Sequence, residues 1–495
     1  MTKILERIHS IVWGAPALIL IIGVGLYLSV RLRVVQLRLL PRAAAAFCRQ
    51  FRKKPKDGQT VSSFQAVCTA LAATVGTGNL VGVAGAICIG GPGAVFWIWV
   101  CGILGMATKF AEATLALRYR VSEGGEYVGG PMYMILGGMG NRWRWLAGLY
   151  SFFGVVAAFG VGNATQINAV IGGIHSVGLR FGWEPGRTGD LVLGVLLAVL
   201  IGAMLMGGAR RIGAAAERLV PVAAAGYILL CAGVLILRRE AIPAALRGIL
   251  EGAFSPRAIT GGAVGSAVQA LRIGCSRGVF TNEAGMGTAS IAHASARVNH
   301  PVEQGLMGIM EVFLDTILIC TMTALVILTS GVAIPYGDDA GSMLTADAFT
   351  AVCGDWSSVF LAAALCCFAF ATVLGWGLYG ARCAQFLFGA GSWKHFVFLQ
   401  MAVVVAGSVL DTGTVWLLAE AVNGLMAIPN LVALMCLSPE LIRLTKEYEI
   451  NNRQTAGGGT KCRFQSMQTD ANPRPCESST PTRWRPRRRA RRSTI

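Results

Sequence analysis

The fold of this chain depends on residues 65–89, which read QAVCTALAATVGTGNLVGVAGAICI. The stretch is apolar and long enough to cross a bilayer, which takes about 20 residues, but Gly76-Thr77-Gly78-Asn79 interrupts it at midspan. An unwound backbone in lipid leaves polar groups unpaired at several kcal/mol each, so it survives only beside a protein-walled cavity. Close helix packing is the alternative use of such glycines. Side-chain oxygens of Thr74, Thr77 and Asn79 favour a binding site instead.

The composition identifies the class of protein around this stretch. Of 495 residues, 54% are hydrophobic and 14% are charged, whereas a soluble domain carries about 25% charged residues. The net charge of +18 is concentrated at residues 31–57 (nine basic, one acidic) and 440–495 (13 basic, five acidic). Basic segments beside apolar helices are typical of cytoplasmic loops. We therefore expect an all-α polytopic membrane protein of the cell (inner) membrane that does not bind nucleic acid.

About eleven transmembrane helices are predicted from the apolar runs. Their ranges are 11–30, 65–89, 93–118, 146–175, 191–206, 213–237, 259–292, 305–331, 357–390, 395–411 and 415–438. The basic loop fixes the orientation, with the N-terminus outside, the C-terminus in the cytoplasm and the acidic segment 332–356 outside. Loop 238–258 disagrees, because it carries Arg238, Arg239 and Arg247 on the predicted outer side.

An odd first helix followed by ten spans indicates one helix plus a 5+5 inverted repeat. The corresponding divisions are 1–30 (N-terminal helix), 31–64 (basic cytoplasmic loop), 65–237 (first repeat), 238–258 (extracytoplasmic loop), 259–438 (second repeat) and 439–495 (disordered basic tail). Inverted repeats that each open with a broken helix are a known transporter arrangement. The second break is predicted at Gly274-Cys275-Ser276-Arg277-Gly278. Half-helix ends at one depth carry opposite partial charges, which suits an amino-acid zwitterion and a small cation.

Two later spans carry side chains suited to the wall of such a site. Gln166 lies in a polar group on the fourth span, where hydrogen bonding between helices is the alternative role. Thr372 and Trp376 are four residues apart and share one helix face. Trp376 between two glycines could close a small pocket or simply fill the core. A tight lid would select alanine or glycine by excluded volume.

Charged side chains within the spans need a reason, because each costs at least about 2.5–3.5 kcal/mol. We expect Lys109 to pair with Glu112, three residues away. Glu420, with apolar neighbours, is a candidate for proton coupling. An inner gate or network is predicted from these residues: Arg272, Arg277, Glu283, Glu311 and Asp315. The histidines and the 14 cysteines show no metal-ligand spacing, so neither a resident metal nor a cofactor is expected.

Several motifs resemble the alanine/glycine:cation symporter family. They are TALAATVGTGN (69–79), IGGPGAVFWIWVCGILGMATKFAEATLALRYR (89–120), GGPMYMI (129–135), GVFTNEAGMGTASIAHASA (278–296), EVFLDTILICTMTALVILTSG (311–331), LGWGLYGARC (374–383) and NGLMAIPNL (423–431). The resemblance implies the fold of the bacterial leucine transporter and uptake of alanine or glycine driven by sodium, or in some members by protons. Four residues depart from the family pattern: Ala381, Glu420, Gly377 and Leu378. The choice between alanine and glycine as the substrate therefore stays open.

The resemblance also implies two overlapping sets of site residues, with the Thr77–Gly78 backbone meeting the substrate carboxylate. The substrate-binding set is Thr77, Gly78, Gln166, Ile273, Gly274, Thr372 and Trp376. The cation-binding set, with Na⁺ as the transported ion, is Ala72, Thr74, Val75, Asn79 and Thr372. The partners are then a small neutral amino acid, a monovalent cation and membrane lipids. A passive channel is the alternative from another class, and no catalytic constellation indicates an enzyme.

Overall fold

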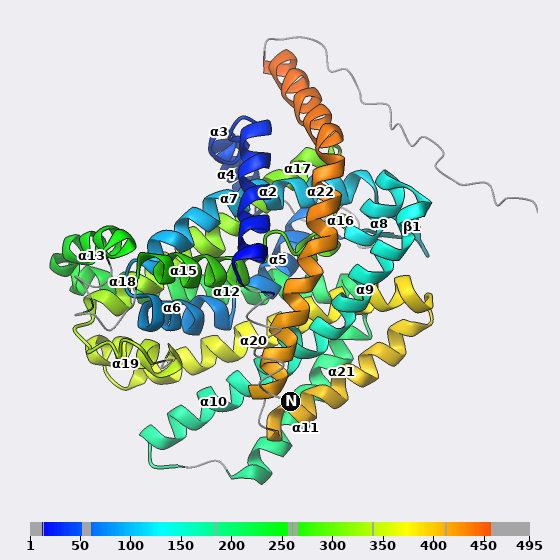
Figure 1. Cartoon of the computed structure of the whole chain (residues 1–495). Helices are drawn as coiled ribbons and strands as arrows, with labels where there is room; N and C mark the ends of the chain where they lie inside the picture. Colours follow the sequence, from blue (N-terminus) through cyan, green and yellow to red (C-terminus); the bar gives the residue numbers. More distant parts are fainter. Residues whose placement is uncertain are drawn as a thin grey trace, which may run out of the picture. The chain divides into compact units, whose positions relative to one another are not determined.

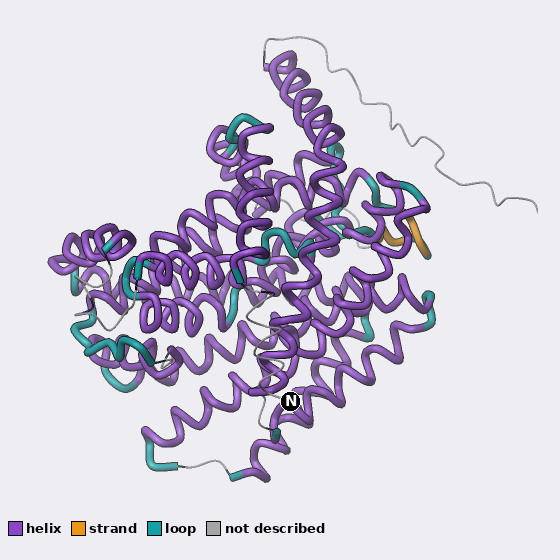
Figure 2. The backbone as a smooth tube through the Cα atoms, viewed as in Figure 1, coloured by secondary structure: helices purple, strands orange, loops and turns teal. Residues whose placement is uncertain are grey.

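The computed structural model describes residues 12, 14–51, 61–183, 186–255, 260, 266–338, 341–410 and 413–456, and these are almost entirely helical (Figure 1). A short antiparallel hairpin, β1 (Val121–Glu123) and β2 (Glu126–Val128), pairs Val121 with Val128 (Figure 2). Residues up to Tyr448 form one compact unit. Its helices pack in pairs that are distant in sequence. Helices α17 (Pro301–Val312) and α15 (Ala267–Asn282) both contact α7 (Ala94–Arg118), and α21 (Ser392–Val409) contacts α11 (Arg187–Leu205).

The long helices follow the predicted spans closely. The first half contains α2 (Ala15–Arg31), α5 (Ser63–Thr74), η1 (Gly78–Gly82), α6 (Val83–Gly90), α7 (Ala94–Arg118), α9 (Arg144–Phe159), η4 (Gly160–Ala164), α10 (Thr165–Arg180), α11 (Arg187–Leu205) and α12 (Gly208–Leu237). The second half contains α15 (Ala267–Asn282), α16 (Thr288–Ala294), α17 (Pro301–Val312), η6 (Phe313–Cys320), α18 (Thr321–Thr329), α20 (Trp356–Phe388), α21 (Ser392–Val409) and α22 (Gly413–Ala456).

Eight helices within the described residues are long and apolar enough to cross a membrane, and nine if the bent pair Ser63–Thr74 and Gly78–Gly90 counts as one span. The two members of that pair are bent by 50°, which confirms the predicted break at midspan. The first helix, α2, is apolar but has only 17 residues. The total of eleven spans therefore stays a prediction.

The first break is held open by its own side chains. A capping box at Ser62 and Gln65 starts α5, and Val75 leaves the helix with φ −76° and ψ 109°. The Asn79 Oδ1 atom then accepts a hydrogen bond of 2.9 Å from the Gly76 N–H. Asn79 thus satisfies a backbone donor that the break exposes, as a helix cap does.

The second break does not lie at Gly274–Gly278, and this prediction was wrong. Helix α15 runs through these residues without interruption. They pack against α7: a Cβ on Gly274 would lie 2.3 Å from the Ala94 carbonyl oxygen, and one on Gly278 would lie 3.0 Å from the Cys101 Cβ. These glycines therefore permit close helix contact, which is the alternative use of small residues in membrane helices.

The actual second break follows at residues 283–287, between α15 and α16. Glu283 has a left-handed backbone with φ +52°, and Gly285 and Gly287 have φ +96° and +79°. Glycine adopts such angles without strain, whereas a residue with a Cβ rarely does. The sequence NEAGMG (282–287) therefore encodes the turn, about ten residues later than predicted.

Segments expected to be loops contain further helical elements. They are α3 (Val35–Arg38) and α4 (Leu40–Phe51) within 31–64, η5 (Arg239–Ala241) and α13 (Ile242–Phe254) within 238–258, α19 (Gly341–Cys353) within 332–356, and α8 (Pro131–Met134), η2 (Ile135–Met139) and η3 (Asn141–Trp143) before α9. All are too short to span a bilayer. The longer ones still bury apolar side chains, as Leu344, Ala348 and Phe349 do on one face of α19.

The predicted tail at 439–495 begins inside α22, which continues to Ala456. Leu441 and Leu444 of this part are buried, and the Glu440 carboxylate accepts hydrogen bonds from Arg118 of α7 and Arg443. These contacts keep the helix folded past its apolar span. Residues 457–495, including the arginine-rich segment, lie outside the described residues.

Candidate functional site

A small cavity lies where the two broken helices meet. Its free volume is ≈ 20 Å³, and it is bounded by the first break, α10, α20, π-helical segment η4 and the end of α15. The lining residues are Ala73, Thr74, Gly76, Thr77, Gly78, Val161, Gln166, Phe280, Glu283, Thr372 and Trp376. The lining combines apolar side chains with a few convergent polar groups, as ligand sites do.

Five of the predicted substrate-binding residues line this cavity, and two do not. Thr77, Gly78, Gln166, Thr372 and Trp376 are brought together from three separate parts of the chain. Gly274 packs against α7, and the Ile273 side chain lies beside Gly90. Phe280 and Glu283 take their place in the lining, because the second break lies further along the chain than predicted. Their signal was the NEAGMG motif (282–287), which follows Phe280 and contains Glu283.

Gln166 serves both of the roles considered from the sequence. Its Nε2 donates 3.1 Å to the Val161 carbonyl and lies 3.4 Å from the Thr77 hydroxyl. A buried amide must find such partners. The residue also lines the cavity, so it both joins α10 to the first break and borders the candidate site.

Trp376 forms one wall of the cavity. Its ring is 1% exposed, and Nε1 donates a hydrogen bond of 3.0 Å to Glu283 Oε1. A Cβ on Gly162 would lie 2.2 Å from the Trp376 Cβ, so η4 passes directly over the residue. The flanking residue Gly375 lets α20 approach Ala73 of α5. The indole is therefore fixed in place between both halves of the molecule.

The predicted cation ligands differ in whether their hydrogen bonds join two helices or stay within one helix. The Thr372 hydroxyl donates 2.9 Å to the Ala72 carbonyl, which joins α20 to the end of α5, where Val75 also lies. Thr74 points its hydroxyl back to the Ala70 carbonyl of its own helix, 3.4 Å away. In the part of the chain that the structure describes, no three His, Cys, Asp or Glu side chains are grouped to hold a metal ion.

Both polar atoms of the Asn79 side chain form hydrogen bonds within the scaffold. Its Nδ2 donates 2.8 Å to Asp315 Oδ1 and 3.0 Å to the Asp315 carbonyl. Because its Oδ1 also closes the first break, both polar atoms of the amide are engaged. The first broken helix is thereby attached to the π-helical segment η6.

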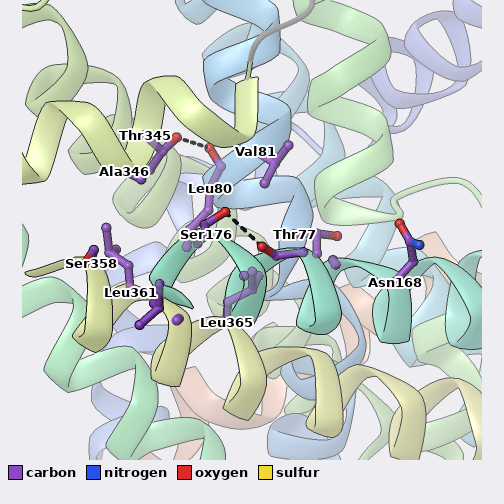
Figure 3. A pocket seen from close by; sticks show the side chains of 15 residues that line it. Thr77, Leu80, Val81, Asn168, Ser176, Thr345, Ala346, Ser358, Leu361 and Leu365 are labelled. Carbon is purple, nitrogen blue, oxygen red and sulfur yellow. Dashed lines mark hydrogen bonds between the residues drawn. The ribbon is translucent and has the colours of Figure 1, made fainter. Parts of the chain in front are cut away.

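A second, wider cavity, termed the vestibule, has a volume of ≈ 400 Å³ (Figure 3). Thr77 lines both spaces. The vestibule walls come from η1, α10, α19 and α20, with Asn168, Ser176, Thr345 and Ser358 as polar members. Two lining residues, Thr345 and Ala346, belong to segment 332–356, which was predicted to lie outside the cell.

Comparison with known proteins decides the family. Residues 1–461 match the family model described as the sodium:alanine symporter family. The chain belongs to the sodium:alanine symporter family. It is 44% identical over 451 residues to an uncharacterized transporter of Haemophilus influenzae, covering 90% of this chain and 96% of the relative. It is 39% identical to the sodium/alanine symporter AgcS of Methanococcus maripaludis, with 90% and 97% covered.

A solved structure supports the fold of this family member. The crystal structure of MhsT in complex with L-phenylalanine matches with a TM-score of 0.52 and 15% identity, covering 78% of this chain and 98% of that one. MhsT has the leucine-transporter fold. The expected fold, a membrane-spanning helical transporter with two broken helices, is thus confirmed.

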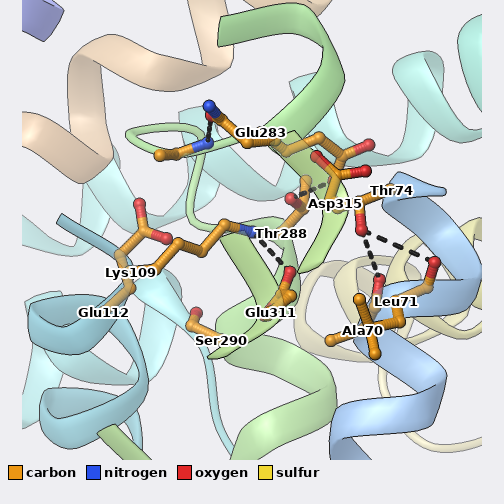
Figure 4. A network of polar contacts seen from close by, with 12 residues as sticks. Ala70, Leu71, Thr74, Lys109, Glu112, Glu283, Thr288, Ser290, Glu311 and Asp315 are labelled. Carbon is orange, nitrogen blue, oxygen red and sulfur yellow. Dashed lines mark hydrogen bonds and ion pairs between the residues drawn. The ribbon is translucent and has the colours of Figure 1, made fainter. Parts of the chain in front are cut away.

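A buried ionic network joins three helices of this symporter-family fold beside the site (Figure 4). The Lys109 ammonium of α7 lies 3.0 Å from Glu311 Oε1 on α17, and His293 Nε2 of α16 lies 2.9 Å from Glu311 Oε2. Gln304 extends this network, because its side chain forms hydrogen bonds with His293 Nδ1 and with the Ser63 hydroxyl of α5. The second break is therefore anchored to both α7 and α5.

This network corrects the predicted inner gate. Glu311 binds Lys109 and His293, and Asp315 binds Asn79 and Thr316, so neither carboxylate takes the predicted arginine as its partner. Arg272 is exposed on α15, and Arg277 lies one turn further along the same helix. The predicted gate assumed a break in α15 at Gly274–Gly278, whereas α15 continues through these residues.

Glu112 also has partners other than the one predicted. Its Oε1 accepts hydrogen bonds from the Gly285 and Gly287 N–H groups, at 2.9 and 3.1 Å, and from Asn430 Nδ2 at 2.8 Å. It therefore holds the second break against α7 and α22 instead of pairing with Lys109. The Glu420 side chain lies outside the described residues.

Proposed function

We propose that the protein takes up alanine, glycine or both, together with Na⁺, by alternating access. The observation that carries this proposal is the ≈ 20 Å³ cavity at the meeting of two broken helices, closed on one side by Trp376. Its free volume holds about one water molecule, so the lining residues, and not the volume, indicate a small polar substrate. Membership of the sodium:alanine symporter family and the name of the relative AgcS support alanine and Na⁺.

The ends of the first broken helix suggest how both solutes bind. Segment η1 begins at Gly78, and the first N–H groups of a helix have no partner within it. The Asn79 N–H donates to the Gly76 carbonyl, so the Thr77 and Gly78 N–H groups are the donors that we assign to the substrate carboxylate. On the other side of the break, carbonyls at the end of α5 and the Thr372 hydroxyl supply oxygen atoms for Na⁺. The substrate and the ion then bind next to each other, which gives the coupling a physical basis.

The available driving force is adequate for concentrative uptake. One positive charge moving down 100 mV releases about 2.3 kcal/mol, and a tenfold cation gradient adds about 1.4 kcal/mol. Together these terms support a substrate gradient of roughly several hundredfold. Coupling requires that the carrier with both solutes bound changes conformation readily while the carrier with the cation alone does not.

Reconstituted uptake tests the proposal. Labelled alanine and glycine, including the alanine enantiomers, are offered to proteoliposomes under imposed sodium, lithium and proton gradients. We expect accumulation that follows the sodium gradient. Accumulation that follows only the proton gradient would show that H⁺, and not Na⁺, is the coupling ion. Uptake that depends on neither gradient would contradict the symport proposal. Single-channel current without counterflow would instead indicate a channel, and loss of substrate mass an enzyme.

Thr372→Val should weaken sodium coupling in particular. The hydroxyl that faces the Ala72 carbonyl is lost while the shape of the side chain is kept. We expect the sodium concentration for half-maximal uptake to rise about tenfold, the size expected for one lost polar contact. Thr445→Val is the matched control, because that buried hydroxyl binds the Leu441 carbonyl of its own helix, away from the cavity. Equal sodium dependence in both variants would contradict the assignment.

Trp376→Ala should enlarge the cavity and admit longer side chains. Each additional methylene group that a pocket accepts or rejects changes selectivity by about 10–200-fold. We therefore expect the preference for alanine over leucine to fall by about 10–100-fold, measured as the ratio of uptake rates. Trp376→Phe, which keeps a ring in place, should retain most of the preference. Unchanged specificity in the alanine variant would show that the indole is not the limiting wall.

We propose the orientation with the N-terminus outside and the C-terminus in the cytoplasm, so that the vestibule opens to the outside. The exposed Cys48 of α4 lies in the basic segment and is expected on the cytoplasmic side. In a variant that retains Cys48 as its single cysteine, an impermeant thiol reagent should label inverted but not right-side-out vesicles. Labelling from the outside would reverse the orientation.

A further inference from the structure

One charged side chain faces the cavity of the candidate site. Among its described lining residues, Glu283 is the single one with an ionisable side chain. It lies at the C-terminal end of α15, where its left-handed backbone begins the second break. From the sequence it was expected in a gate, but the cavity position gives it direct access to a bound ligand.

The partners of the Glu283 carboxylate are neutral. Oε1 accepts a hydrogen bond of 3.0 Å from Trp376 Nε1, and Oε2 accepts one of 2.6 Å from the Thr288 hydroxyl. Each carboxylate oxygen can accept a second hydrogen bond. The side chain is thus held firmly by two donors and still has acceptor capacity toward the cavity.

The charge of Glu283 also lacks a direct counter-charge in the described part of the chain. The buried ammonium group of Lys109 is bound to Glu311 at 3.0 Å instead. Glu283 is 3% exposed, and an unpaired carboxylate at such a depth is strongly unfavourable. A cationic group entering the cavity would relieve this cost.

The opposite side of the same cavity has the complementary character. Gly76, Thr77 and Gly78 line it, and the continuous helix Gly78–Gly90, which starts with η1, begins there with a partial positive charge. The C-terminal end of α15, which carries Glu283, has a partial negative charge that adds to the carboxylate. An α-amino acid with its carboxylate toward η1 would therefore place its ammonium group toward Glu283.

We infer that the Glu283 carboxylate binds the α-ammonium group of the transported amino acid, and that this contact makes the protein reject carboxylic acids lacking an amino group. The inference rests on the proposed function, because it assigns a contact within the same cavity. Trp376 then has a second role, since its indole N–H fixes the carboxylate that recognises the substrate.

The test compares two ligands of nearly equal size in the purified full-length protein in sodium buffer. Alanine and propionate differ by the amino group. Glu283→Gln removes the charge and keeps the shape, so the affinity for alanine should fall by about 10–100-fold, the range for a lost charged hydrogen bond. The affinity for propionate, measured by competition at high concentration, should stay the same. Glu283→Asp keeps the charge and should retain part of the discrimination.

A matched control separates recognition from structural support. Glu112 is another buried carboxylate that holds the second break, but it does not line the cavity. Glu112→Gln should therefore change the two affinities by the same factor. A parallel loss of alanine and propionate binding in Glu283→Gln, or no loss of either, would overturn the inference.

Two further results keep the outcomes distinct. If wild-type protein binds alanine and the Glu283 variants keep the full discrimination, the inference fails and the proposed function stands. If wild-type protein binds neither alanine nor glycine in sodium, both fail. Should Glu283→Gln not survive purification, Glu283→Asp carries the test alone, since a carboxylate withdrawn by one methylene must weaken alanine binding more than propionate binding.

Discussion

Gly78→Val is expected to abolish sodium-dependent alanine uptake while the protein still inserts in the membrane. A Cβ at this position would lie 3.2 Å from the Thr281 hydroxyl oxygen and 3.5 Å from the Thr281 Cα. The branched valine side chain extends further and would push the two broken helices apart where the substrate carboxylate is proposed to bind. Displacement of a site by about 1 Å costs roughly 100-fold in rate, so we expect at least that loss.

A neighbouring glycine provides the control for this experiment. Gly82 ends the same π-helical segment, and no atom lies within 4 Å of the position of an added Cβ. Gly82→Ala should therefore transport at nearly the wild-type rate. Uptake and membrane insertion are measured separately, by labelled alanine in vesicles and by the amount of protein in washed membranes. Normal uptake by Gly78→Val would show that transport does not require the substrate to approach the backbone closely at Gly78.

Breaking the Lys109–Glu311 pair should produce the largest loss of stability. Both side chains are fully buried, and Gly305 and Gly308 of α17 let that helix approach α7 closely enough to form the pair. Lys109→Met leaves the Glu311 charge with His293 as its remaining partner. Removing one partner of a buried ion pair costs about 3–5 kcal/mol. We expect a clearly lower apparent Tm of the protein in detergent.

The double variant shows whether Lys109 and Glu311 stabilise the protein as a pair or independently of each other. Lys109→Met together with Glu311→Met replaces both charges by apolar side chains, and such replacements of buried pairs are often neutral. The double variant should therefore be more stable than Lys109→Met alone. If the two losses simply add, the residues are not coupled and the network has been misinterpreted.

The first broken helix could be predicted because its signal is local. Two glycines and three hydroxyl or amide side chains stand at the middle of an apolar span, and a regular membrane helix requires none of them. Gln166, Thr372 and Trp376 were also found from the sequence, since polar or bulky residues beside small ones are unusual in such spans. Each of these predictions used residues within a few positions of one another.

The second break could not be located in the same way. Gly274 and Gly278 resemble a break as strongly as Gly285 and Gly287 do, and the sequence contains no measure of which pair packs against another helix. The difference became visible only through α7, whose Ala94 carbonyl lies where a Cβ on Gly274 would be. Ile273 and Gly274 were therefore assigned to the cavity in place of Phe280 and Glu283.

The partners of the buried charges illustrate the same limit. Lys109 and Glu112 are three residues apart, so local spacing suggested that they pair. In the fold, Lys109 binds Glu311, 202 residues away in sequence, and Glu112 binds the backbone of the second break. Several acidic side chains compete for one lysine, and the choice among them depends on which helices lie side by side.

The sequence by itself determined that the chain crosses a membrane, that its first long span is interrupted and which family motifs it carries. These properties depend on composition and on residues that are neighbours along the chain. The tertiary structure alone decided where the second helix breaks, which carboxylate faces the cavity and which one neutralises Lys109. Such contacts join helices about 100 to 200 residues apart, and their energies arise only when packing removes water from between the helices.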